Sequence, residues 1–136
     1  MLIWTQAERV FRGWMLVSIG MYFIGAVGFL LIGSWIPGIL EALLGRPLGF
    51  APYPAMVEGA FWRALAVSMM AMITWISWKA WRDPRANANL VPVLLLSKAC
   101  STSVYFLYFI KDGTFQYLLG MLTDGPIFVA TALLWW

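Results

Sequence analysis

Four long apolar stretches divide this sequence and leave few folds open to it. They cover residues 14–35, 61–81, 90–110 and 115–136. A helix needs about 20 mainly apolar residues to cross the hydrocarbon of a bilayer, where backbone polar groups must find their partners within the protein. Only 11% of the residues are charged, against about a quarter in a soluble domain. The sequence therefore predicts an all-α integral membrane protein, a four-helix transmembrane bundle in which residues 1–136 form a single domain.

The connections between these stretches differ in length and composition. Residues 36–59 contain four prolines and several glycines, which predicts an irregular loop between the first and second spans. Within that loop, residues 38–44 could form a short helix on the membrane surface. Ahead of the first span, Thr5 and Glu8 have the spacing of a capping box, which predicts a short interfacial helix running into that span.

Basic residues predict how the bundle sits in the membrane, because the cytoplasmic side collects Lys and Arg in its short loops. In a four-span arrangement, more of them fall on the side of the two termini than on the opposite side. The first group is Arg9, Arg12, Lys79, Arg82 and Arg85, and the second is Arg46, Arg63 and Lys111. We expect a multi-pass protein with both its N-terminus and its C-terminus in the cytoplasm.

The amino-acid composition also excludes several classes of function. The chain contains no histidine, which removes the commonest metal and haem ligand and the usual general acid or base near neutral pH. Its single cysteine, Cys100, excludes chemistry that needs a Cys-x-x-Cys pair. Nine basic residues without a basic run give no nucleic-acid footprint. We expect no catalytic site, no metal and no nucleic-acid partner.

Two ionisable residues lie deep inside predicted spans, Lys98 in the third and Asp124 in the fourth. Helical spacing places Ser101 and Tyr105 on the same face as Lys98, and Arg63 lies near the outer end of the second span. The axial separation of Asp124 from each cation is on the order of 7 Å, which long side chains can cover. We expect Asp124 to pair with Lys98, Arg63 or both, at the centre of a polar seam shared by the last three spans.

Such a seam has two interpretations. Asp124 could change its protonation in a proton or ion relay, or the pair could fix the register of the helices. The second interpretation is favoured because no histidine or second buried acid continues a relay.

Gly125 and Pro126 follow Asp124 directly. A proline cannot donate to the carbonyl four residues earlier, so a kink or a break is expected here. With a break, Asp124 could cap a half-helix, as in the binding sites of many transporters. An ordinary proline kink is the simpler alternative.

These observations favour a non-enzymatic membrane protein, an accessory or structural subunit that packs against other membrane subunits in a larger complex. The alternative is a small oligomeric transporter or channel-like protein that uses the seam of Asp, Lys and Arg. A membrane enzyme would require a cleft that groups Asp124 with Ser101, Tyr105 or Tyr117. No cofactor is expected, although lipid, quinone or carotenoid would meet aromatic side chains at bilayer depth, namely Tyr22, Phe23, Phe106, Tyr108 and Phe109.

Overall fold

The computed structural model describes residues 4–31, 35–51 and 60–135, without the side chains of residues 35–37 and 60–63. Within these ranges the protein is helical and contains no β-strand beyond one isolated bridge between Ala51 and Thr114. The elements in chain order are α1 (Gln6–Leu31), α2 (Trp35–Leu40), the π-helix η1 (Glu41–Gly45), α3 (Ala60–Arg82), the 3₁₀-helix η2 (Ala88–Leu90), α4 (Val91–Asp112) and α5 (Phe115–Trp135).

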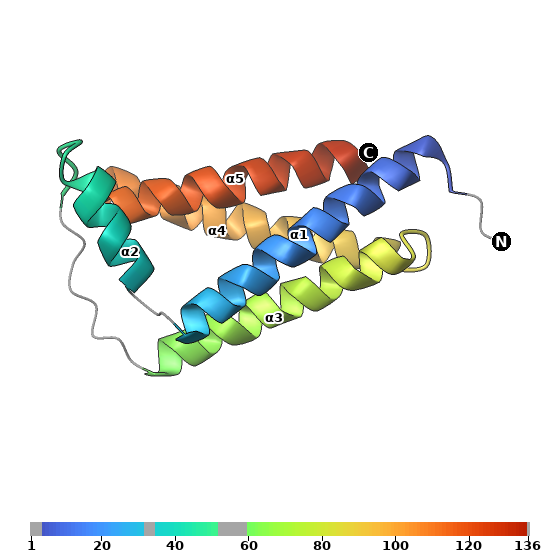
Figure 1. The fold of residues 1–136 in the computed structure, drawn as a ribbon. Helices are drawn as coiled ribbons and strands as arrows, with labels where there is room; N and C mark the ends of the chain where they lie inside the picture. Colours follow the sequence, from blue (N-terminus) through green and yellow to red (C-terminus); the bar gives the residue numbers. More distant parts are fainter. Residues whose placement is uncertain (1–3, 32–34, 52–59, 136) are drawn as a thin grey trace.

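The four long helices form two antiparallel pairs that share one core. Helix α1 packs along α3, and α4 packs along α5 (Figure 1). On α1 the buried side chains are Phe11, Met15, Ser18 and Tyr22, which recur at intervals of three and four residues and so lie on one face. They meet apolar residues of the other three helices, namely Ile73, Ile76, Ala80, Val91, Leu94 and Ile127.

Among the described residues, three helices are long and apolar enough to cross a membrane. They cover Gln6–Leu31, Ala88–Asp112 and Phe115–Trp135. Helix α3 has 23 residues but is not one of the three. Its tryptophans and basic residues, Lys79 and Arg82 among them, dilute its apolar stretch. The described residues therefore form an all-helical protein with three candidate membrane spans.

The capping box predicted at the N-terminus is present. The amide of Thr5 donates to the Glu8 carboxylate at 2.7 Å, and the amide of Glu8 donates to the Thr5 hydroxyl at 3.3 Å. The helix predicted ahead of the first span runs into it, because α1 continues without interruption from Gln6 into the apolar stretch. Residues 6–31 contain no proline that would end the first helix.

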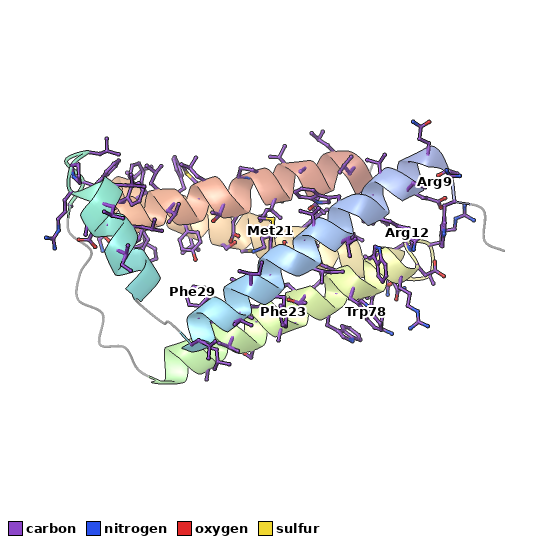
Figure 2. All side chains as sticks on the ribbon, viewed as in Figure 1. Arg9, Arg12, Met21, Phe23, Phe29 and Trp78 are labelled. Atoms are coloured by element: carbon purple, nitrogen blue, oxygen red, sulfur yellow. The ribbon has the colours of Figure 1, made fainter. Side chains whose placement is uncertain are left out.

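One end of the bundle gathers the start of α1, the end of α3 and the end of α5. The Arg12 guanidinium donates to the Trp81 carbonyl at 2.7 Å, and the rings of Phe11 and Trp135 lie 5.4 Å apart. Arg85, in the connection after α3, forms an ion pair with Glu8. Arg9 and Arg12 lie at this end of the protein (Figure 2), and Lys79 and Arg82 are in the last turn of α3, so the basic residues that the sequence assigns to one side lie at one end.

At the opposite end, the segment after α1 folds back onto the turn between α4 and α5. The Gln116 amide donates to the Glu41 carboxylate at 2.6 Å, and the Phe50 ring lies 5.5 Å from that of Phe115. The short helix predicted over residues 38–44 begins earlier, at Trp35, and continues as η1 to Gly45. Residues 52–59 of the predicted loop lie outside the described residues.

Helices α4 and α5 approach closely where Gly120 faces Tyr105. A Cβ atom at Gly120 would lie 2.8 Å from the Tyr105 ring, well inside van der Waals contact. Small residues at helix interfaces allow such approaches in membrane proteins.

Gly120→Ala should destabilise the protein by about 1–3 kcal/mol, because the Tyr105 ring must shift and carry its helix with it. The measurement is thermal or SDS unfolding in mild detergent. Gly20→Ala is the matched control, since a Cβ at that position meets nothing within 4 Å. If both variants unfold alike, the close approach of α4 to α5 at Gly120 is not a determinant of stability.

Candidate functional site

Lys98 and Asp124 form an ion pair between α4 and α5. The Lys98 Nζ lies 2.7 Å from the Asp124 Oδ1, and the two side chains are 5% and 15% exposed. The Ser101 hydroxyl donates to the other oxygen of the same carboxylate, Oδ2, at 2.5 Å. Both oxygens of Asp124 therefore accept a hydrogen bond, one of them from a cation.

The helical repeat explains this arrangement. Lys98 and Ser101 are three residues apart, so they lie on one face of α4, and that face is turned toward α5. From α1, the Tyr22 ring covers the ammonium group of Lys98, with 4.7 Å between Nζ and the ring centroid. A cation against an aromatic face gains up to about 2 kcal/mol when it is removed from water.

An isolated charge at the centre of a bilayer costs about 2.5–3.5 kcal/mol on insertion scales. The pair avoids this cost because each charge neutralises the other inside the protein. Ser101 donates to the second oxygen of Asp124, so neither carboxylate oxygen is left without a hydrogen bond.

The other predicted seam residues are placed differently. Tyr105 packs its ring against Gly120. The side chain of Arg63 lies outside the described residues, so the predicted pairing of Arg63 with Asp124 stays a prediction. Tyr117 stacks on Tyr108 with 5.2 Å between ring centroids.

Of the kink or break predicted at Gly125 and Pro126, the break is not found. Helix α5 is one helix from Phe115 to Trp135 with Pro126 inside it. Asp124 does not cap a half-helix, because its carboxylate is held by Lys98 and Ser101. Gly125 instead faces α4, where a Cβ would lie 3.5 Å from the Thr102 methyl group, an ordinary contact.

Sequence reasoning missed the contribution of α1 to the site. Tyr22 is 3% exposed and so is not a lipid-facing residue. The indole of Trp14 donates to the Thr131 hydroxyl at 2.8 Å, which ties α1 to α5. The spacing of Phe11, Met15, Ser18 and Tyr22 places them on one face of α1, but it does not indicate which residues of the other helices that face contacts.

Two buried hydroxyls lie close to this region without a hydrogen-bond partner in the described part of the chain, those of Tyr22 and Thr102. Within the same described ranges, no group of three or more acidic or cysteine side chains could hold a metal ion.

Comparison with known proteins adds no relative: no family model, curated protein or solved structure matches this chain significantly.

Lys98→Met and Asp124→Asn should each lower stability by about 3 kcal/mol, because each leaves a buried group without its partner. The double variant should recover a large part of that loss, since no uncompensated charge remains. Unfolding of the two single variants and the double variant in mild detergent measures this coupling.

The turn between α4 and α5 offers a matched control, Lys111→Met with Asp112→Asn. These residues carry the same charges outside the core, where Lys111 is exposed and Asp112 is half-buried. Their substitution should change stability by less than about 1 kcal/mol. Additive effects of Lys98→Met and Asp124→Asn would contradict a stabilising pair.

Proposed function

We propose that this chain is a non-enzymatic four-span membrane protein that serves as an accessory or structural subunit of a larger membrane complex. The observation that carries the proposal is the closed ion pair of Lys98 and Asp124, which satisfies its own charges and presents no free ionisable group. A pair of this kind fixes the register of two helices, a role attested for buried polar groups.

The outer surface of the bundle supports the same proposal. Every long helix carries exposed large apolar side chains, among them Ile24, Leu107 and Leu133, which are 71%, 65% and 74% exposed. The described connection between α3 and η2 is short, and α4 and α5 are joined by Gly113 and Thr114 alone. Exposed apolar surface of this kind suits contact with lipid and with other membrane subunits.

The proposal includes α3 as the fourth span and both termini in the cytoplasm. Helix α3 packs along α1 over its length, and its 23 residues would cover about 35 Å. A helix that pairs with a membrane span at this length crosses the same hydrocarbon. The basic residues gathered near the start of α1 and the end of α3 then define the cytoplasmic end.

Single cysteines test this topology in a chain in which Cys100 has been replaced by alanine. Leu48→Cys and Lys111→Cys should react with a membrane-impermeant maleimide added to intact cells. Ala86→Cys should react only after the membrane is opened, because it lies at the other end of α3. Labelling of Leu48→Cys and Ala86→Cys from the same side would show that α3 does not cross.

A second candidate function is transport through the bundle. It is favoured by the hydroxyls of Tyr22 and Thr102, which are buried without a hydrogen-bond partner among the described residues, because a proton path requires polar groups inside the bundle. In that case Asp124 would exchange its proton during each cycle.

The two functions differ in what the purified chain does. Extracted from its own membrane in mild detergent, an accessory subunit should migrate in a stable assembly larger than any small oligomer of this chain. Reconstituted alone into liposomes that contain a pH-sensitive dye, it should pass protons no faster than empty liposomes.

A clean homo-oligomer would contradict the accessory role. A proton flux that Asp124→Asn abolishes while the protein stays folded would establish transport instead. The double variant Lys98→Met, Asp124→Asn is the control for folding, because it removes both charges together.

A further inference from the structure

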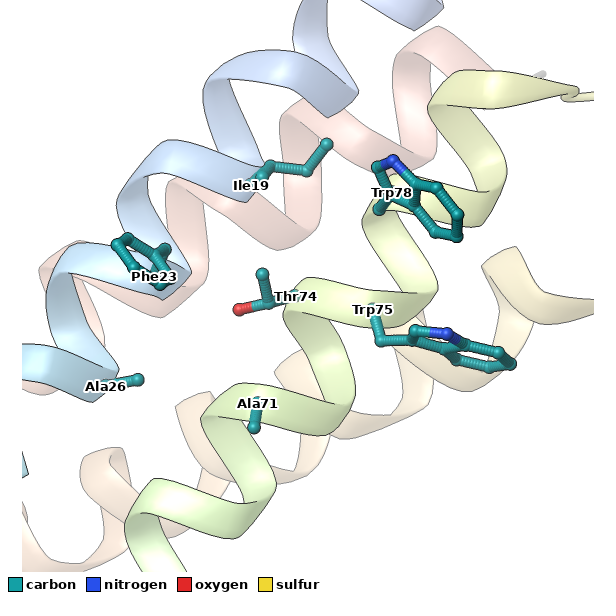
Figure 3. A pocket seen from close by; sticks show the side chains of 7 residues that line it. All are labelled: Ile19, Phe23, Ala26, Ala71, Thr74, Trp75 and Trp78. Atoms are coloured by element: carbon teal, nitrogen blue, oxygen red, sulfur yellow. The ribbon is translucent and has the colours of Figure 1, made fainter.

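A shallow groove runs between α1 and α3 on the outer face of the bundle, away from the ion pair. Its volume is about 380 Å³, within the range of small-molecule sites. Seven side chains line it, Ile19, Phe23 and Ala26 from α1 and Ala71, Thr74, Trp75 and Trp78 from α3 (Figure 3).

The lining of this groove is apolar, and its single hydroxyl is already used. Thr74 donates to the Met70 carbonyl of its own helix at 2.7 Å. Phe23, Trp75 and Trp78 are 59%, 53% and 36% exposed, so the groove opens to the outside and, with α3 as a span, faces the bilayer. An occupant of the groove itself must be apolar and must reach it from the lipid.

Two cations lie at one end of the groove, on the rings that line it. The Lys79 Nζ is 5.3 Å from the Trp75 ring and 5.6 Å from the Trp78 ring, and the Arg82 guanidinium is 5.6 Å from the Trp78 ring. Both cations are in the last turn of α3, where the membrane surface is expected.

Neither cation is neutralised inside the described part of the chain. The ion pairs described there join Arg85 to Glu8 and Lys98 to Asp124. The nearby Asp83 carboxylate accepts hydrogen bonds from the amides of Arg85 and Ala86 instead, at 3.1 and 3.0 Å.

We propose that this groove, with Lys79 and Arg82, is a binding site for an anionic phospholipid. One acyl chain lies along Phe23, Ala71 and Trp75, and the phosphate lies against the two cations. From Trp78 to Ala71 the groove follows α3 for about 10 Å, a depth that acyl-chain carbons occupy below a headgroup. Quinone or carotenoid would fill the apolar part but would leave both cations without a counter-charge.

The positive charge of Lys79 and Arg82 also suits the lipid composition of the cytoplasmic leaflet. The cytoplasmic leaflet carries the anionic lipids in many membranes, and basic side chains near its surface attract their headgroups. The site rests on the proposed topology, with α3 as a span and its last turn at the cytoplasmic surface, but not on the accessory role, since a transporter of the same fold would present the same groove.

Native mass spectrometry of the full chain tests the site. The protein is equilibrated with vesicles of equal parts phosphatidylglycerol and phosphatidylcholine that have the same acyl chains, and then released in mild detergent. The retained lipid should be enriched in phosphatidylglycerol. Lys79→Gln and Arg82→Gln should each lower that enrichment by about fivefold, as expected for one basic group near a membrane surface.

Two matched controls are needed. The first tests whether any basic residue of the protein attracts the headgroup, and the second tests whether a bulky side chain on any exposed helix face lowers lipid retention. Lys111→Gln removes one charge at the other end of the bundle and should keep the enrichment. Ala71→Phe fills the groove and should lower the retained amount of both lipids, whereas Val129→Phe on the exposed face of α5 should not. If Ala71→Phe fails to fold, Ala26→Phe fills the same groove from α1.

Equal retention of the two lipids by the unaltered protein would overturn the proposal. So would an enrichment that Lys111→Gln lowers as much as Arg82→Gln, because the attraction would then be diffuse. Enrichment that persists in the folded groove-filling variants would show that the lipid binds elsewhere.

Discussion

The hydrocarbon of a bilayer does not solvate a charged side chain, so a charge within it is stabilised by an oppositely charged group of the protein. Lys98 and Asp124 satisfy that requirement for each other, and the rest of the bundle is arranged around their contact. Helices α4 and α5 have to lie side by side at one register for the 2.7 Å contact to form. Helix α1 then covers the ammonium group with Tyr22, which brings the second helix pair against the first.

Much of this fold follows from the sequence, because the length of an apolar stretch and the residues that begin or end a helix are local signals. The apolar stretches and the capping box at Thr5 and Glu8 depend on neighbouring residues alone. The helical continuation of α5 through Pro126 depends on more than the neighbouring residues. The proline removes one hydrogen bond, while the remainder of the helix and its neighbour α4 hold the backbone in place.

The candidate site was predictable in part for the same reason. Helical spacing brings Lys98 and Ser101 to one face, and simple depth arithmetic places Asp124 within reach. The choice of α1 as the third contributor could not be read from spacing, since it depends on which helix packs across the pair. The position of Tyr22 in the helical repeat indicates only that it lies on the buried face of α1. Its contact with Lys98 depends on how α1 packs against the other helices.

The order of the two charges along the chain has a consequence for biosynthesis. Lys98 is 26 residues ahead of Asp124, so α4 is complete before its carboxylate partner has been synthesised. A lone α4 would expose an ammonium group to lipid at a cost of about 3 kcal/mol, and α5 removes that cost once it is made. We therefore expect α4 and α5 to enter the membrane together as a helical hairpin, because an intermediate in which they are apart has the higher free energy.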